Sequence, residues 1–283
     1  MPETGQTVRR ASVDVDGAPA SYLTAGDGRV VLLLHGTYWS RVWQPAIAPL
    51  AAAGLRPVAV DLPGCGRSGG ELTLGTATVP ALTAWVERFL DALGAGAPLL
   101  VAGHDIGGAI AQRLTVRGSR AVERLALVNS VTYDSWPVPG VARYRDPDVV
   151  AATTADELVA ARRTALSAAI GRPIEGDELA EYLSPWTDLR VARSWMALAG
   201  AADPRYTLEL ADDLAAAAVP TLLLWGEDDT FQRVEYAERY AAEIPGATLR
   251  RIPGSGHIPT ESAPDIAAAA LAEWFTLVAA AKR

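Results

Sequence analysis

The chain has 283 residues, of which 50% are hydrophobic and 20% are charged, a balance typical of a globular protein with a large core. Its net charge of −8 and the lack of a Lys/Arg run argue against a nucleic-acid partner. No apolar run is long enough to span a bilayer, and the N-terminal segment lacks a signal-peptide core, so we expect a cytoplasmic protein with no membrane partner.

Short apolar segments alternate with helical patterns along the chain. Two early strands, around Val13 and Tyr22, are expected to pair antiparallel at a sheet edge. Residues Val79–Leu93 carry one apolar helical face, and residues 263–280 form a final predicted helix. Six further strands are expected at residues 29–36, 56–64, 98–105, 122–130, 220–229 and 247–257. This alternation is typical of an α/β protein, with a mostly parallel eight-stranded sheet and helices on both faces.

Residues 131–214 break the alternation. They contain helical patterns but no strand-like run, and aromatic residues concentrate there. We expect a helical cap at 131–214, inserted after the sixth strand and lying over the strand ends, on a core domain formed by 1–130 and 215–283. Packing between helices explains any single one of these aromatics equally well.

Polar side chains occur where the predicted parallel strands end. The carboxyl ends of such strands lie at one edge of the sheet, where open α/β sheets bind their ligands. Each of the three histidines lies at or beside such an end. The residues found at these ends, in chain order, are His35, Asp61, Asp105, Asn129, Asp229 and His257.

Five short motifs occupy these strand ends. GHDIG at 103–107 has the spacing glycine, nucleophile, glycine that a sharp strand-to-helix turn requires. The others are LLLHG at 32–36, DLPGCGRS at 61–68, WGEDD at 225–229 and GSGHIPTESAP at 254–264. In this order the motifs resemble the α/β-hydrolase fold family over essentially the whole chain. Cys65 lies in the DLPGCGRS segment. It is the only cysteine, so no intrachain disulfide is possible.

The resemblance implies a role for each matching residue. Asp105 stands at the nucleophile position, Asp229 rather than Asp228 at the position of the triad acid, and His257 at that of the histidine. The backbone N–H groups of Thr37 and Ile106 are implied as oxyanion donors. His35, His104 and Asp61 are interpreted as structural, and an N-cap role alone does not explain Asp105 with its two glycines.

An aspartate at this position indicates chemistry that differs from that of a serine. A carboxylate is already ionised at neutral pH and can displace a leaving group from an sp³ carbon without a base. The ester formed on Asp105 would then be hydrolysed by water activated by His257 and Asp229. This arrangement resembles that of the haloalkane dehalogenases, the haloacetate dehalogenases and the soluble epoxide hydrolases.

This sequence lacks diagnostic residues of each of these three enzyme groups. Ile106 replaces the tryptophan that holds the halide in haloalkane dehalogenases, and Ile106 and Ala109 replace the arginines of haloacetate dehalogenases. Tyr38 replaces the usual proline of epoxide hydrolases, and one of their cap tyrosines is missing. The favoured function is hydrolysis of a fairly apolar, aromatic or polycyclic epoxide, and the alternative is dehalogenation. An atypical biosynthetic reaction and a non-catalytic receptor are less favoured, since a receptor needs no complete triad.

The cap is expected to supply the groups that stabilise the leaving group. A phenol should face Asp105, and Tyr182 is favoured ahead of Tyr144 and Tyr206. The indole N–H groups of Trp195, Trp186 and Trp39 are the candidate halide donors. The substrate pocket is expected to be lined by Tyr38, Trp39, Trp136 and Tyr206. No metal cluster, phosphate loop or dinucleotide fingerprint appears, so we expect a small-molecule substrate and no cofactor, with a homodimer left open as the assembly.

Overall fold

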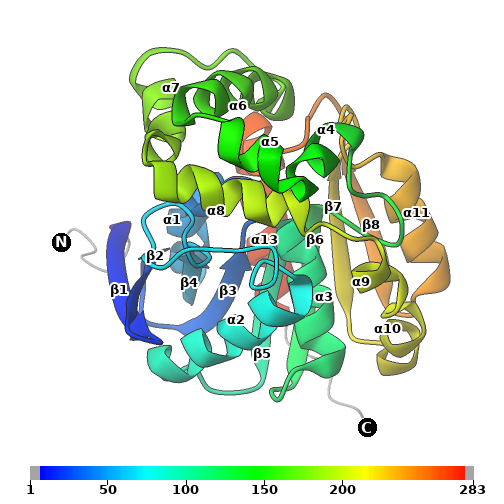
Figure 1. Cartoon of the computed structure of the whole chain (residues 1–283). Coiled ribbons are helices and arrows are strands. Elements are labelled where there is room, and N and C mark those ends of the chain that lie inside the picture. Colours follow the sequence, from blue (N-terminus) through cyan, green and yellow to red (C-terminus); the bar gives the residue numbers. More distant parts are fainter. Residues whose placement is uncertain (1–6, 278–283) are drawn as a thin grey trace, which may run out of the picture.

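The computed structural model describes residues 7–277, and an eight-stranded sheet forms its centre (Figure 1). The two edge pairings, β1 with β2 and β2 with β4, are antiparallel, and every other pairing is parallel. The prediction of a mostly parallel sheet with an antiparallel edge is confirmed. In spatial order the strands are β1 (Arg9–Val15), β2 (Ala18–Thr24), β4 (Leu55–Val60), β3 (Arg29–Leu34), β5 (Leu99–Asp105), β6 (Val122–Ser130), β7 (Thr221–Gly226) and β8 (Ala247–Ile252).

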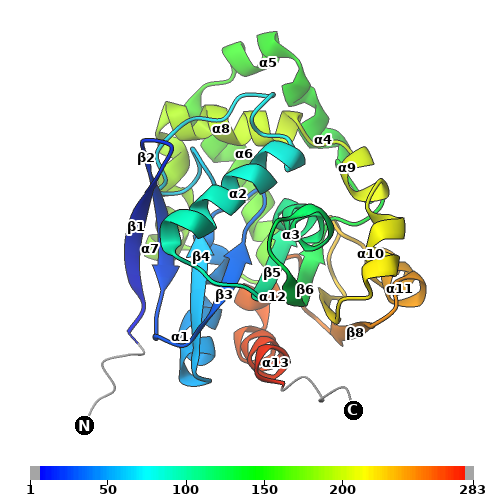
Figure 2. The ribbon, with the colours of Figure 1, turned by 90° about the horizontal axis from the view of Figure 1, so that it is seen from below.

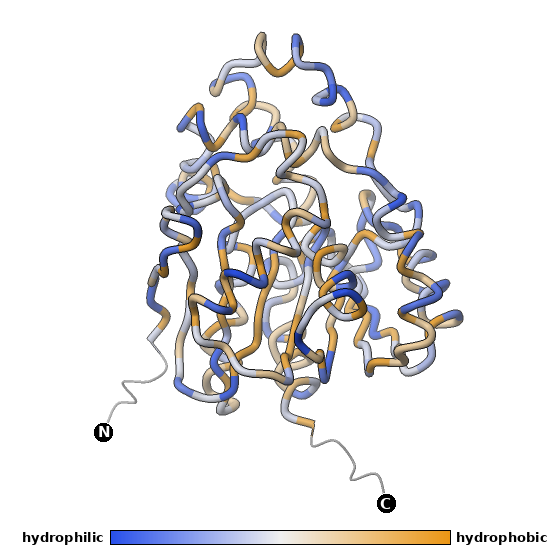
Figure 3. Tube along the Cα trace, turned by 60° about the horizontal axis from the view of Figure 1, so that its bottom comes forward, coloured by the Kyte–Doolittle hydropathy of each residue, from blue (hydrophilic) through white to orange (hydrophobic). Residues whose placement is uncertain are grey.

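Helices cover both faces of this sheet (Figure 2). On one face lie α1 (Gln44–Ala52) and α13 (Pro264–Thr276), and on the other lie α2 (Val79–Leu93), α3 (Ile106–Arg117) and α11 (Val234–Glu243). In β3, Val31 and Leu33 pack toward the first group and Leu32 and Leu34 toward the second, and all four are fully buried. Burial on both faces explains the continuous apolar runs of the central strands, which Figure 3 shows in the hydrophobic colour. Residues 278–280 of the predicted final helix lie outside the described residues.

The chain between β6 and β7 contains helices joined by loops and no strand. In Figure 1, α5 to α8 lie above the sheet, over the end where β5 passes into α3. The last two helices instead pack against α3, and the expected cap boundary at residue 214 falls inside α10. The elements of this segment are α4 (Pro139–Ala142), η2 (Arg143–Arg145), α5 (Pro147–Ala152), α6 (Ala155–Ile170), α7 (Gly176–Leu183), η3 (Ser184–Thr187), α8 (Leu189–Gly200), α9 (Arg205–Leu208) and α10 (Ala211–Ala217).

Two short elements flank the strand ends, η1 (Ser40–Trp43) after β3 and α12 (Pro259–Ser262) after β8. Both adjoin the loops that carry polar residues of the site described below. No helix within residues 7–277 has the length and apolar character needed to cross a membrane.

Candidate active site

Asp105 lies at a sharp turn between β5 and α3. Its backbone has φ 54° and ψ −129°, a conformation that costs energy for any residue with a side chain. A Cβ at Gly103 would lie 2.5 Å from the Gly107 carbonyl oxygen, and one at Gly107 would lie 2.3 Å from the Leu34 carbonyl oxygen. Both glycines are therefore required by close backbone approach, which is the reason predicted from the motif.

The loop after β3 holds the Asp105 carboxylate. Its Oδ2 accepts hydrogen bonds from the Thr37 backbone N–H at 2.9 Å and the Thr37 hydroxyl at 2.7 Å. A Cβ at Gly36 would lie 2.5 Å from the Ile106 backbone nitrogen, so only glycine lets the loop come this close. Nε2 of His35 accepts from the Leu62 N–H at 2.9 Å, which braces the loop as expected. Burial is the main cause that lowers the pKa of His35 and keeps its ring neutral.

His257 and Asp229 form a buried pair beside Asp105. Nδ1 of His257 donates to Asp229 Oδ2 at 2.8 Å, and the Asn129 side-chain amide donates to the same oxygen at 2.7 Å. The backbone N–H groups of Phe231 and Gln232 donate to Asp229 Oδ1 at 2.7 and 3.0 Å. Three donors besides the imidazole thus fix the carboxylate, and the carboxylate in turn fixes the imidazole.

The charges around His257 set its protonation. Burial disfavours the charged ring, but the Asp229 and Asp105 carboxylates outweigh burial and raise the pKa of His257. Burial first, and then the neighbouring His257, lower the pKa of His104 to about 4, so that this second ring stays neutral. Nε2 of His104 lies 2.9 Å from the His257 carbonyl oxygen, and the two ring centroids are 4.7 Å apart. His104 therefore supports the His257 ring, as its structural interpretation predicts.

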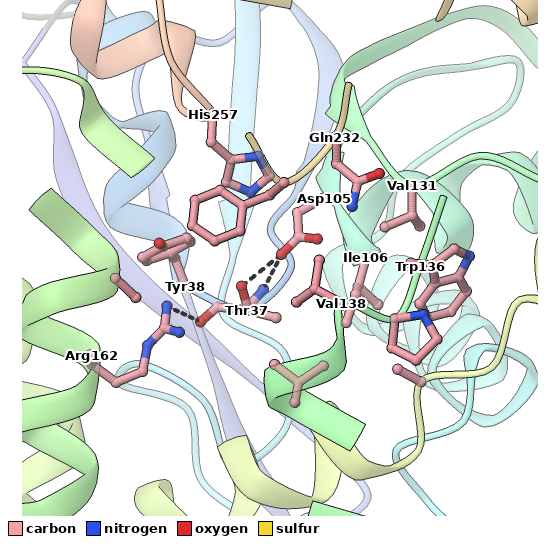
Figure 4. Close-up of a pocket in the computed structure, with 15 residues that line it drawn as sticks. Thr37, Tyr38, Asp105, Ile106, Val131, Trp136, Val138, Arg162, Gln232 and His257 are labelled. Carbon is pink, nitrogen blue, oxygen red and sulfur yellow. Dashed lines mark hydrogen bonds between the residues drawn. The ribbon is translucent and has the colours of Figure 1, made fainter. Parts of the chain in front are cut away.

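A small cavity opens above these groups (Figure 4). Its volume is about 70 Å³. For comparison, an engineered apolar cavity that holds benzene measures about 150 Å³. Core loops form the polar floor, and residues of the helical segment 131–214 form much of the apolar wall. The lining residues are Thr37, Tyr38, Asp105, Ile106, Val131, Trp136, Pro137, Val138, Val141, Arg162, Ala165, Ala202, Phe231, Gln232 and His257.

The structure brings several predicted site residues to this cavity. Thr37, Ile106 and Tyr38 line it from the core, and Trp136 lines it from the start of the cap segment. The Trp136 indole N–H donates to the Thr207 hydroxyl at 2.8 Å, so its ring forms wall and its polar atom is used elsewhere.

The expectation that Tyr182 faces Asp105 is wrong. Its hydroxyl donates to Glu261 Oε1 at 2.6 Å, and Arg41 pairs with the same oxygen at 2.6 Å. A buried phenol needs a polar partner, and the buried carboxylate supplies a strong one on the side away from the cavity.

The other two tyrosines proposed as donors, Tyr144 and Tyr206, also lie away from the cavity. The Tyr144 hydroxyl accepts from Arg143 at 2.7 Å, and the Tyr206 hydroxyl accepts from Arg205 at 3.2 Å. Neither residue belongs to the lining set, which corrects the proposal of Tyr144 as a leaving-group donor and Tyr206 as a pocket wall. Each phenol is satisfied by the arginine that precedes it in the chain.

Three predicted tryptophans lie outside the cavity lining. The Trp195 indole N–H donates to the Thr37 carbonyl at 2.7 Å, and that of Trp39 donates to the Tyr182 carbonyl at 3.1 Å. The Trp186 ring packs against the Arg162 guanidinium at 5.1 Å. None of the three lines the cavity, so the expectation of Trp186 and Trp195 as halide donors and of Trp39 as a pocket wall is corrected.

Arg162 and Gln232 are the polar lining residues that sequence reasoning missed. Arg162 follows Leu158 by four residues and precedes Leu166 by four, which places it on the buried face of α6. That spacing is visible in the sequence and was a signal for an inward-facing arginine. Gln232 follows Asp229 by three residues, within the turn that holds the acid.

Comparison with known proteins identifies the family. Residues 31–270 match the alpha/beta hydrolase family, so the chain belongs to that family and is a hydrolase with this fold. The most similar relatives include a 2-hydroxy-6-oxononadienedioate/2-hydroxy-6-oxononatrienedioate hydrolase of Burkholderia vietnamiensis, which is 28% identical over 83% of this chain and 83% of its own length. The polyketide synthase ThaQ of Burkholderia thailandensis is 26% identical over 85% of this chain, which spans only 11% of that protein. A haloalkane dehalogenase of Mycobacterium marinum is 34% identical over 42% of this chain and 41% of its own length.

Solved structures share the whole architecture. The epoxide hydrolase CorEH superposes with a TM-score of 0.81, at 21% identity over 95% of this chain and 99% of that one. An alpha/beta hydrolase fold protein from Burkholderia ambifaria gives a TM-score of 0.79, at 27% identity over 93% of this chain and 99% of that one. These similarities establish the fold, and the reaction has to be argued from the site.

Proposed function

We propose that the protein hydrolyses a small epoxide through a covalent ester on Asp105. One observation carries the proposal. A carboxylate stands at the nucleophile turn, lines the cavity next to His257, and has one of its two oxygens held by both donors of Thr37. That arrangement leaves the second oxygen available to attack an electrophile in the cavity.

The first half-reaction opens the ring. The free oxygen of Asp105 forms a bond to an oxirane carbon, the carbon–oxygen bond breaks, and the departing oxygen takes up a proton. Tyr38 is proposed as the donor, since it is the one tyrosine among the described residues that line the cavity. Burial is the main cause that raises the pKa of Tyr38, so its phenol keeps a proton to give.

The second half-reaction hydrolyses the ester. Neutral His257 takes a proton from water, the water oxygen bonds to the ester carbonyl carbon, and Asp229 stabilises the imidazolium that forms. Because Thr37 already holds Oδ2, the same two donors stabilise the negative charge that develops on that oxygen. Loss of the alcohol, with the proton returned from His257, leaves Asp105 as a carboxylic acid. Its proton then passes to the Tyr38 phenolate, directly or through solvent water, which restores both groups. The overall reaction adds one water to one epoxide and yields a vicinal diol.

The size of the cavity bears on the substrate. A volume of about 70 Å³ is smaller than a benzene-sized cavity, which favours a smaller substrate than the aromatic or polycyclic one expected from the sequence. A short aliphatic epoxide fits it better.

Dehalogenation is the second candidate, because a halide could leave from the same carbon and because a haloalkane dehalogenase is similar to part of the chain. The indole N–H groups of Trp39 and Trp195 already donate to protein acceptors, and Trp186 does not line the cavity. A departing halide would therefore lack the tryptophan donors that the sequence suggested, whereas Tyr38 suits an alkoxide. This difference favours the epoxide.

Two assays test the proposal. Purified protein is mixed with propylene oxide, and separately with bromoethane, and the release of diol and of bromide is measured. We expect diol and little bromide; bromide alone would select the second candidate.

The covalent step is tested with His257→Gln, in which attack proceeds but ester hydrolysis stops. Intact-mass spectrometry after substrate addition should show one adduct that maps to Asp105, and Asp105→Asn is the control that should stay unmodified. An unmodified His257→Gln protein, from a wild type that turns the epoxide over, would rule out the ester mechanism.

A further inference from the structure

The cavity contains a buried cation that the proposed reaction does not use. Arg162 projects from α6 and lines the cavity with Asp105 and His257, and only 6% of the residue is exposed (Figure 4). Among the described residues that line the cavity it is the only lysine or arginine.

Arg162 has no acidic partner within residues 7–277. Its Nη2 donates to the Thr37 carbonyl at 3.4 Å, at the outer limit of a hydrogen bond, and its buried Nε has no partner. The equally buried Arg41 differs, because it pairs with Glu261 at 2.6 Å and with Glu181 at 3.1 Å. Burial of an unpaired charge is costly, so a group that supplies the missing negative charge would bind here with a large advantage.

Three aromatic rings hold the guanidinium in place. Its central carbon lies 4.6 Å from the Tyr38 centroid, 4.6 Å from that of Trp195 and 5.1 Å from that of Trp186. Cation–π contacts of this kind offset part of the cost of burial, and they fix the orientation of the group. They leave its buried Nε–H without an acceptor and its Nη2 with only the long contact to the Thr37 carbonyl, a geometry that suits an anionic ligand.

A second unpartnered polar group lies on the other side of the nucleophile. The side chain of Gln232 lines the cavity, and its buried Oε1 has no hydrogen-bond partner. In Figure 4 Asp105 lies between Arg162 and Gln232. A ligand that reaches from one to the other therefore passes over the nucleophile, and it needs polar groups at both ends.

We propose that Arg162 binds a carboxylate carried by the substrate, which makes the substrate class a short 2,3-epoxy acid. This inference rests on the proposed function. With the carboxylate on Arg162, the epoxide carbons lie toward Asp105, and a hydroxyl formed by ring opening has Gln232 as a partner. The charge of Arg162 also offsets the repulsion between an anionic substrate and an anionic nucleophile. For glycidate the reaction adds one water to give glycerate, and no other reactant is needed.

Glycidate and glycidamide form a matched pair for the test, because they have nearly the same shape and differ in charge. We expect wild type to show kcat/KM at least tenfold higher for glycidate, and Arg162→Gln to abolish that preference, with a loss of kcat/KM at least tenfold larger for glycidate than for glycidamide. Arg163→Gln is the control, since Arg163 is the exposed neighbour on the same helix. No preference in wild type, or an equal loss on both substrates in Arg162→Gln, would overturn the assignment.

A binding measurement separates this inference from the reaction. Calorimetry with lactate and lactamide probes the anion site without chemistry. Wild type and Arg163→Gln should bind lactate more tightly than lactamide, and Arg162→Gln should lose the difference. Lactate binding that depends on Arg162, without turnover of either epoxide, would sustain the anion site and reject the epoxide reaction. Turnover of both epoxides at equal rates, with no lactate preference, would sustain the reaction and reject the anion site.

Discussion

Replacing Tyr182 with phenylalanine removes one hydroxyl from a buried cluster that joins the cap segment to the core. The hydroxyl donates at 2.6 Å to Glu261, whose carboxylate also pairs with Arg41 at 2.6 Å and Arg172 at 3.1 Å. Tyr182 lies on α7, whereas Glu261 lies on α12, four residues after His257. The substitution keeps the ring, which packs under Arg41 with 4.8 Å between the guanidinium carbon and the ring centroid.

The expected loss of stability follows from the one hydrogen bond that the substitution removes. A hydrogen bond to a charged group contributes about 1.5–3 kcal/mol. Because Arg41 and Arg172 remain on the carboxylate, the cost should stay below the roughly 3–5 kcal/mol of a buried charge left without its partner. For a domain somewhat smaller than this chain, each kcal/mol lowers Tm by roughly 2–4 °C, so Tm should fall by about 3 to 12 °C.

The assay compares Tm and epoxide turnover in wild type, Tyr182→Phe and Tyr236→Phe. Tyr236 is a matched control, because it is partly buried on α11 and its hydroxyl makes no hydrogen bond to another residue in the described part of the chain. Tyr182→Phe should lose stability but keep turnover within about twofold at temperatures where it is folded, and Tyr236→Phe should match wild type. A tenfold loss of turnover with an unchanged Tm would refute the reasoning and would place the Tyr182 phenol at the reacting carbon.

Further predictions concern Asp229 and the turn at Asp105. Burial lowers the pKa of His257, and Asp229 leads the groups that raise it above its ordinary 6.5. Only the neutral ring activates water, so turnover should rise with pH through a midpoint above 6.5. Asp229→Asn should move that midpoint down and cut turnover by orders of magnitude, and Asp228→Asn should do neither; equal losses would contradict the choice of acid. Gly103→Ala should lower the free energy of unfolding by about 1–3 kcal/mol or prevent folding, because its Cβ would lie 2.5 Å from a backbone carbonyl oxygen. Gly96→Ala, with nothing within 4 Å, should change it by less than about 0.5 kcal/mol in denaturant unfolding.

Local sequence patterns were sufficient to predict the sheet and the core residues that form the floor of the site. The apolar runs predicted the central strands because a strand buried on both faces has no position for a polar residue. The glycines around Asp105 predicted the turn because no other residue fits between adjacent backbones. Asp229 and His257 were identifiable because parallel strands deliver their carboxyl ends to one edge, so residues far apart in the chain arrive at the same place.

Only the tertiary structure determines which residues of the cap face the cavity. A helical residue faces whatever its helix packs against, and short helices joined by turns leave many packings consistent with one sequence. The Tyr182 hydroxyl points away from the cavity because Glu261, 79 residues later in the chain, supplies a buried acceptor there. Arg162 turned inward because three aromatic rings from separate segments surround its guanidinium. Sequence spacing specifies which residues share a face of a helix, but the partners that meet that face come from distant parts of the chain, and their charges and hydrogen-bonding groups decide which side chains meet the substrate.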